Sequence, residues 1–277
     1  MTGPGRASRL TVGVALVVAL VVGACGGSGG GGATEPVRAA ADQTLAAGSA
    51  RVALRLTYSA AAVTAEVSGE GIVDLKGRRG SFTLDLGSLA GLGLGGTVET
   101  VVDQSGIFVK APAALRGSKP WLKVDLAALG SQLGIDIGAL GGLQSADLGQ
   151  TLSWLASGAS KMAKVGKERV RDAETTHYRG ALDLAQATAG LPPEARKPAE
   201  DAARALGTLV VPVDVWLDGA GRMRKVRLSV QSGGSATPTV GAVEFELYDF
   251  GVQADIAVPP PDQVTDLLAT ILGGGRR

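Results

Sequence analysis

The stretch "VPVDVWLDGAGRMRKVRLSV", residues 211–230, decides the fold. Apolar side chains occupy every second position on both sides of the turn "DGAG": Val211, Val213, Val215 and Leu217, then Val226, Leu228 and Val230. A period of two is typical of a β-strand with one buried face and one wet face. Two such strands joined by a short turn predict an antiparallel hairpin.

The same alternation recurs in "RVALRLTYS" (51–59), in "SFTLDL" (81–86) and in residues 243–247. Together these runs predict one large antiparallel sheet with a single buried face. Because sheets twist, we expect a strongly curved sheet with helices on its concave side, an α+β fold. Gly69 and Gly71, inside an expected strand, favour bends. The periodicity alone leaves open whether the sheet forms a half-barrel or a sandwich.

Four segments have helical spacing. The first spans residues 36–47, with Val37, Ala40, Ala41, Thr44 and Leu45 on one face. In the second, Asp147 caps a helix that carries Leu148, Leu152 and Leu155. The third, residues 192–206, is polar and is expected on the outside. In the last, Asp262 caps a helix that carries Val264, Leu267, Leu268 and Ile271.

The N-terminal segment has the layout of a secretory signal, with Arg6 and Arg9 before an uncharged apolar run from Leu10 to Val22. Residues Val22-Gly23-Ala24-Cys25 resemble a bacterial lipobox, which implies cleavage before Cys25 and a diacylglycerol on its sulfur. The alternative is an ordinary signal peptide with a stray thiol. The glycines that follow predict a flexible tether. We therefore divide the chain into a signal peptide (1–24), lipidated Cys25 with its tether (25–36), one domain (37–272) and a disordered tail (273–277).

Composition excludes several classes of function. Removing the leader leaves 25 basic against 26 acidic residues, a balance that gives no electrostatic reason to bind nucleic acid. Cys25 is the only cysteine, so a mature chain has no disulfide and no thiolate metal site. The abundance of glycine, alanine, valine and arginine, with little lysine, indicates a high-GC actinobacterial genome.

The sequence offers no catalytic constellation. The only histidine, His177, lies in an expected strand on the face of Thr175 and Arg179, without a nucleophile motif of the Gly-x-Ser-x-Gly type. Five carboxylates are scattered without the spacing of a catalytic pair or a metal site: Asp183, Glu200, Asp201, Asp249 and Asp255. We expect neither enzymatic activity nor a metal or cofactor.

Two further motifs have two readings each. "GLGLGG" places Gly91, Gly93 and Gly96 in the dinucleotide-loop pattern, but "TVETVVD" after it predicts a strand rather than a helix, which favours a plain loop. A basic cluster could meet a phosphate or a lipid head group, or could mark a charged edge strand: Lys161, Lys164, Lys167, Arg169 and Arg171.

Residues 125–163 are rich in leucine, isoleucine and glycine and must be covered by other parts of the chain. Their large side chains could plug the concave face as core, or could line an incompletely filled cavity that accepts an acyl chain. The candidates are Leu133, Ile135, Ile137, Leu140, Leu143, Leu152, Trp154 and Leu155.

Three segments, taken with the lipobox, resemble the actinobacterial lipoproteins of the LppX/LprG type, which are similar in fold to LolA, the periplasmic lipoprotein carrier. These are "VRDAETTHYRGALDLA" in the 169–185 region, "VPVDVWLDGAGRMRKVRLSV", and "EFELYDFGVQADIAVPPPDQVTDL" (244–267). The resemblance implies a bent half-barrel closed by helices and non-covalent binding of lipids or glycolipids in an apolar cavity. It carries over no catalytic residue, and only Cys25 transfers by position.

Two hypotheses about function follow. The first is a lipoprotein on the extracytoplasmic face of the cell membrane that binds a lipid or glycolipid and carries it within the cell envelope. The second is a membrane-anchored sensor or interaction module whose concave face is fully packed and which meets an envelope protein.

If Cys25 carries the lipid anchor, Cys25→Ser should release the protein from membranes, because a short apolar leader that has been cleaved leaves nothing to hold the body there. Membrane fractionation with immunoblotting measures this. A Cys25→Ser chain that remains with the membranes unprocessed would contradict the lipobox interpretation.

Overall fold

The computed structural model describes residues 32–60, 63–92, 95–110, 119–124, 148–193, 196–197, 200, 208–232 and 239–267. Its helices are α1 (Thr34–Ala46), α4 (Leu148–Gly158) and α5 (Leu184–Thr188), with two 3₁₀ helices, η1 (Gly87–Leu92) and η2 (Pro261–Gln263). None of the helices in this part of the chain is both long and apolar enough to cross a bilayer.

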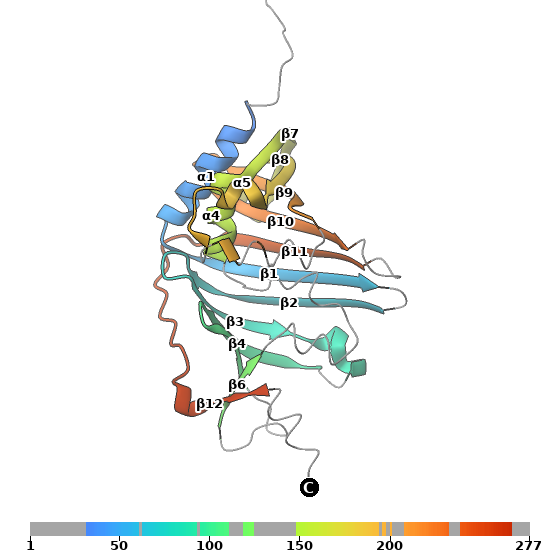
Figure 1. The fold of residues 1–277 in the computed structure, drawn as a ribbon, viewed down its shortest axis with the longest axis vertical. Coiled ribbons are helices and arrows are strands. Elements are labelled where there is room, and N and C mark those ends of the chain that lie inside the picture. The colour runs from blue at the N-terminus through green and yellow to red at the C-terminus, as the bar shows by residue number, and fades with distance from the viewer. Residues whose placement is uncertain are drawn as a thin grey trace, which may run out of the picture.

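The strands form one twelve-stranded sheet in the order β12-β6-β5-β4-β3-β2-β1-β11-β10-β9-β8-β7. Their bounds are β1 Ser49–Ala60, β2 Val63–Asp74, β3 Arg79–Asp85, β4 Thr97–Asp103, β5 Gly106–Lys110, β6 Trp121–Val124, β7 Ala159–Val170, β8 Ala173–Asp183, β9 Val210–Asp218, β10 Met223–Ser232, β11 Thr239–Tyr248 and β12 Val264–Asp266. The pairing of β12 with β6 is parallel, and the other strand pairs are antiparallel. The sheet is curved and open, which confirms the expected half-barrel (Figure 1).

The opening stretch forms the β9–β10 hairpin. Its turn closes through backbone bonds from Asp218 N to Arg222 O (2.9 Å) and from Gly221 N to Asp218 O (3.0 Å). Gly221 has a φ of +75°, a conformation that side-chain-bearing residues rarely adopt. The alternating apolar residues of β9 are buried as predicted: Val211, Val213, Val215 and Leu217.

The two glycines of β2 lie where β3 comes close to the strand. Gly69 and Gly71 share a face with Val52 and Leu54 of β1. A Cβ on Gly71 would lie 2.1 Å from the Ser81 carbonyl oxygen and 2.9 Å from Phe82 Cδ1, so the β3 side of the sheet closes over the glycine. The missing side chain at Gly71 therefore permits the close approach of β2 and β3 that the concave face requires.

Helices α1 and α4 pack together on the concave side, beside β7–β10 (Figure 1). The buried face of α1 is Val37, Ala40, Ala41 and Thr44, as its spacing predicts. Thr44 also fixes α1 to the sheet, because its hydroxyl accepts a hydrogen bond from Met223 N at 2.8 Å. Leu148, Leu152 and Leu155 of α4 are buried as expected.

The prediction of a C-terminal helix is wrong for its first residues. Asp262 lies in η2, and Val264 lies in β12, paired with Trp121 of β6. The β-branched pair Val264-Thr265 follows three prolines that favour an extended chain, and the free edge of β6 offers it a ladder of hydrogen bonds. Leu268 and Ile271, most of the 192–206 segment, Asp147 and Cys25 lie outside the described residues.

Replacing Gly71 by alanine should lower the free energy of unfolding by about 1–3 kcal/mol, because the new methyl group overlaps the backbone of β3. Gly166→Ala in β7 is the control, since a Cβ there has nothing within 4 Å, and we expect it to stay within about 0.5 kcal/mol of the wild type. Urea unfolding followed by circular dichroism measures both. Equal midpoints would show that β2 and β3 do not close over Gly71.

Candidate functional site

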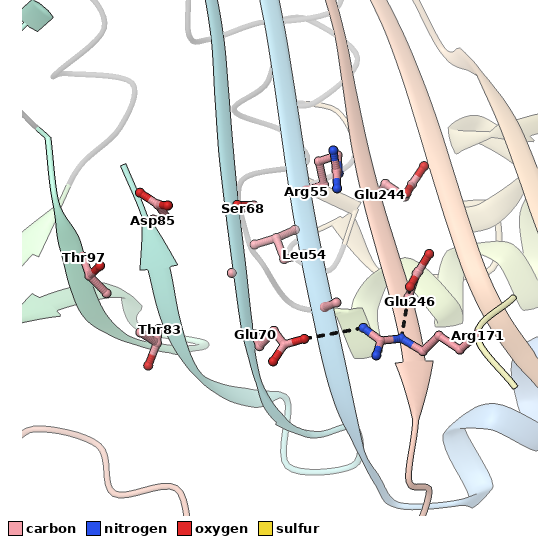
Figure 2. Close-up of a pocket in the computed structure, with 12 residues that line it drawn as sticks. Leu54, Arg55, Ser68, Glu70, Thr83, Asp85, Thr97, Arg171, Glu244 and Glu246 are labelled. Atoms are coloured by element: carbon pink, nitrogen blue, oxygen red, sulfur yellow. Dashed lines mark hydrogen bonds and ion pairs between the residues drawn. The ribbon is translucent and has the colours of Figure 1, made fainter. Parts of the chain in front are cut away.

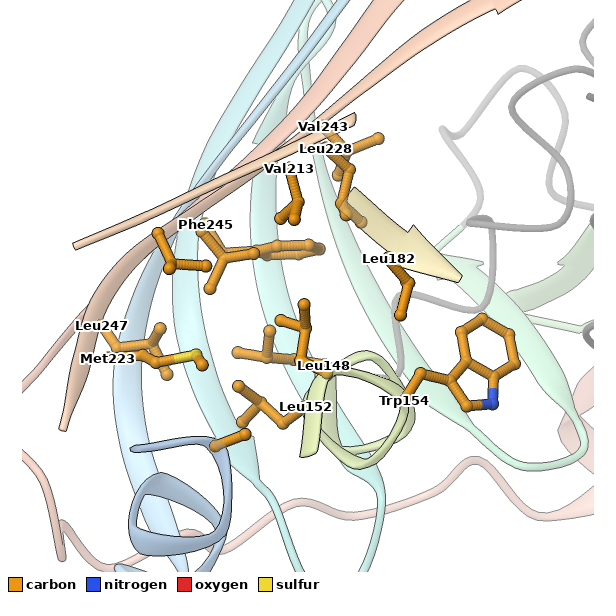
Figure 3. Close-up of a cluster of buried hydrophobic side chains, with 14 of the residues drawn as sticks. Leu148, Leu152, Trp154, Leu182, Val213, Met223, Leu228, Val243, Phe245 and Leu247 are labelled. Carbon is orange, nitrogen blue, oxygen red and sulfur yellow. The ribbon is translucent and has the colours of Figure 1, made fainter. Parts of the chain in front are cut away.

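The concave face is the candidate binding surface, and its two halves differ. Beside β7–β10 it is filled by one cluster in which the side chains of α4 meet those of the sheet (Figure 3). Of the predicted cavity residues, Leu152 and Leu155 are 0% exposed and Trp154 is 3% exposed, all within this cluster. The other five, Leu133, Ile135, Ile137, Leu140 and Leu143, lie outside the described residues.

Across β1–β5 the concave face carries apolar side chains of intermediate exposure, which we call the apolar strip. The strand registers place them on the same face as buried Leu54 and Phe82. The strip consists of Leu56, Tyr58, Val67, Leu84, Val98, Ile107 and Val109. Leu56, Tyr58, Leu84 and Ile107 also pack against the main core cluster, so the strip continues the core without a polar break.

Two buried polar atoms, one in the α4 cluster and one on the face of the strip, have no hydrogen-bond partner among the described residues. They are Nε1 of Trp154, a residue that is 3% exposed, and Oγ1 of Thr100, a residue that is 2% exposed. Thr100 pairs with Phe82 in the register of β3 and β4, so it shares the face of the strip. Leaving a buried donor or acceptor unpaired costs about 1–3 kcal/mol, which an oxygen atom of a bound molecule could recover.

The convex face carries a separate polar cluster around His177. The histidine is 4% exposed, and its ring stacks on Trp216 with centroids 4.3 Å apart. Nδ1 lies 2.9 Å from Glu168 Oε1, and Nε2 lies 2.6 Å from Asp214 Oδ1. His177 does share a face with Thr175 and Arg179, as predicted, but neighbouring strands bury it.

This cluster ties four strands together. Glu168 comes from β7, His177 from β8, Asp214 and Trp216 from β9, while Lys225 of β10 lies 5.1 Å from the Trp216 ring. A neutral imidazole carries one N–H, so both contacts are hydrogen bonds to carboxylates only when the ring is protonated. The sequence analysis did not predict this cluster. The signal that could have indicated it is that Asp214 and Trp216 alternate with the buried valines of β9 and therefore lie together on the outer face.

Glu168 is the titratable group that this cluster perturbs most clearly. The hydrogen bond that Trp216 Nε1 donates at 2.7 Å lowers the pKa of the Glu168 carboxyl. Partial desolvation raises this pKa, and the contact with His177 lowers it further. A carboxyl with a lowered pKa in the folded state stabilises the fold above its unfolded pKa. That stabilisation is lost as the pH falls through the folded value.

A shallow polar pocket of about 500 Å³ lies on the convex face over β1–β4 and β11 (Figure 2). Arg171, from the β7–β8 turn, reaches across it to Glu246 Oε2 (3.1 Å) and Glu70 Oε1 (3.6 Å). Its guanidinium lies 4.0 Å from the ring centroid of Tyr248. The carboxylates are thus already paired with a cation, and an acyl chain would meet charged groups there.

Several of the remaining sequence candidates have structural roles. The strand β4 follows the glycine motif as predicted, and Gly96 has a φ of +104°. Asp183 caps α5 by accepting from Gln186 N, and Asp249 pairs with Arg51. Within the described ranges, no group of three or more His, Cys, Asp or Glu side chains could hold a metal ion. The basic cluster lies in β7 and the turn after it, with β7 at one edge of the sheet.

No family model matches this chain, and no curated protein matches it. It is similar to the lipoprotein LppX of Mycobacterium tuberculosis, with 14% identity over 80% of this chain and 98% of that one and a TM-score of 0.47. For LprF of Mycobacterium bovis the identity is 13%, the coverage 82% and 96%, and the TM-score 0.38. For the Pseudomonas aeruginosa MucA/MucB complex the values are 14%, 83%, 59% and 0.30.

Glu168→Gln should lower the free energy of unfolding at pH 7 by about 1 kcal/mol, because the substitution removes the charge from the bonds to Trp216 and His177. The difference from the wild type should shrink as the pH falls from about 5 to about 3, where the carboxyl becomes protonated. Urea unfolding at both ends of this range measures it.

Glu99→Gln is the control, since Glu99 pairs with Lys110 on an exposed surface and such pairs contribute about 0–1 kcal/mol. A loss in Glu168→Gln that stays constant with pH would contradict the role of the charged carboxylate.

Proposed function

We propose that this chain is a lipid-anchored extracytoplasmic lipoprotein whose concave face binds the acyl chain of a lipid or glycolipid. The observation that carries this proposal is the apolar strip, a row of partly exposed apolar side chains on the inner face of β1–β5. A row of this kind exposes apolar area at the place where a packed core would bury it.

The chemistry of the strip suits a hydrocarbon tail. Each methylene moved from water to an apolar surface contributes about 0.8 kcal/mol, so a long acyl chain gains affinity from length alone. The strip needs no charged partner for this, and its members supply only aliphatic surface and the Tyr58 ring. The outer pocket, in contrast, is lined by Arg55, Glu70, Arg171 and Glu246, among others, and excludes a tail.

The unpaired atoms of Trp154 and Thr100 suit the polar end of such a ligand. Trp154 Nε1 donates, and the Thr100 hydroxyl both donates and accepts. Ester, carboxylate or sugar oxygens could satisfy both atoms. A ligand with apolar length and a few oxygens therefore matches the inner face better than a pure hydrocarbon does.

Release of an intact ligand follows from this mode of binding, because apolar contact and hydrogen bonds form no covalent bond with the lipid. Together with attachment through Cys25, this supports a carrier that moves lipid within the cell envelope. The rival function, a membrane-anchored sensor or protein-interaction module, requires the same inner face to be filled by the chain itself.

Lipid extraction and mass spectrometry of the purified full chain should reveal a bound lipid. Val98→Glu should weaken binding of a fluorescent fatty acid at least tenfold, because a carboxylate in the strip loses its water when the tail binds. Thr97→Glu is the matched control: it adds the same side chain one residue away on the opposite, exposed face, and it should bind as the wild type does.

A chain that yields no lipid and takes up no fatty acid would overturn the carrier function and favour the rival. Equal weakening by Val98→Glu and Thr97→Glu would place the binding surface elsewhere than the strip. Circular dichroism of both variants separates loss of binding from loss of fold.

A further inference from the structure

The edge strand β7 carries a concentration of free positive charge. Lys161, Lys164, Lys167 and Arg169, which we call the cationic edge, are all exposed. Three of the nine lysines of the whole chain lie in this one strand. Among the described residues, none of the four side chains has a hydrogen-bond or salt-bridge partner.

Most of the basic side chains elsewhere on the sheet and in its turns behave differently. Nine of them pair with carboxylates: Arg51, Arg55, Arg79, Lys110, Arg171, Arg179, Arg222, Arg224 and Lys225. Within β7 the single acidic residue is Glu168, which already contacts His177 and Trp216 on the convex face. The cationic edge therefore presents an uncompensated charge of one sign.

Protection of the sheet edge does not account for this charge. Strand β7 already interrupts its ladder with irregular register between Ser160 and Ala163 and again between Lys164 and Gly166. Lys161 has a φ of +51°, which turns the chain out of regular strand geometry. The opposite edge, β12, contains Asp266 and no basic residue, so the fold tolerates an edge without cations.

The cationic edge lies beside the point where the N-terminal tether meets the body. Thr34, the first residue of α1, accepts a hydrogen bond from Met162 N at 3.4 Å. Four residues later, Arg38 donates to the Ala159 carbonyl at 3.1 and 2.8 Å. Thr34 is nine residues after Cys25, so the chain between them spans at most about 30 Å when extended. Attachment of the body through a lipid on Cys25 would thus hold β7 close to the membrane.

We propose that the cationic edge docks on the anionic surface of the bilayer and so fixes the orientation of the body. Each basic residue near an anionic surface raises affinity about fivefold, and the tether supplies a high local concentration. By their register, Lys164 and Lys167 share the face of Tyr178, which packs against the core. Docking would therefore hold the helix-covered half of the body toward the membrane. This inference uses membrane attachment and does not depend on lipid binding in the strip.

The test is lysine acylation footprinting of the full chain, anchored in vesicles of phosphatidylcholine alone or with about 30% phosphatidylglycerol. The rate at Lys161 is compared with that at Lys110, which lies in β5 near the other end of the sheet. We expect labelling of Lys161 to be about fivefold slower on anionic vesicles, with Lys110 unchanged. About 1 M salt should abolish the difference, because the screening length falls to about 3 Å.

The edge variant, Lys164→Gln/Lys167→Gln/Arg169→Gln, should label equally at Lys161 on both kinds of vesicle. The matched control removes three exposed cations elsewhere, Lys76→Gln/Lys123→Gln/Arg227→Gln, and should keep the wild-type difference. Equal labelling of the wild type on both vesicles at low salt would overturn the proposal, as would equal losses in the two variants. Flotation with neutral vesicles reports the anchor independently, and lipid extraction reports the strip.

Discussion

The fold depends on how a sheet of twelve strands covers its concave apolar face. A flat sheet of this width would leave that face in water, so the strands must curl around other parts of the chain. Close approach of β3 to β2 over Gly69 and Gly71 permits the curl on one side. Helices α1 and α4 fill it on the other, and Thr44 joins α1 to β10 there. The apolar strip is the part of the inner face beyond these helices.

Side chains on the convex face have a different role, because they link long strands over which no second layer of helices or strands lies in the described part of the chain. Side-chain bonds cross the strands there: Glu168, His177 and Asp214 link β7 to β9, and Arg171 links the β7–β8 turn to β11 and β2. Burial of His177 against Trp216 keeps water away from its contact with Asp214 and strengthens that contact. Over β7–β11 the polar groups thus lie on the convex face and the apolar groups on the concave face, whereas over β4 and β5 a second apolar cluster, with Val101, Phe108 and Ile256, covers part of the convex face.

Strands β1, β3, β9, β10 and β11 and helix α1 could be predicted from the sequence because each has one face mainly buried, and a one-sided element shows its period directly. The cluster around His177 could not, since it joins residues from four strands and depends on their register. The C-terminal helix was mispredicted because Val264, Leu267 and Leu268 fit a helical period, while the free edge of β6 drew Val264–Asp266 into a strand. Local spacing contains no information about which edge is free.

The positions of the cationic edge and of the apolar strip constrain how a lipid would be handled. Strand β1, where the strip begins, is five strands from β7 in the sheet, and strands are about 4.8 Å apart, so the two are separated by roughly 24 Å along the sheet. With β7 at the membrane surface, a tail on the strip would lie clear of the bilayer. The bound lipid would then be fully extracted, as a carrier requires, whereas a sensor that samples lipids in place would need its apolar strip at the docking edge itself.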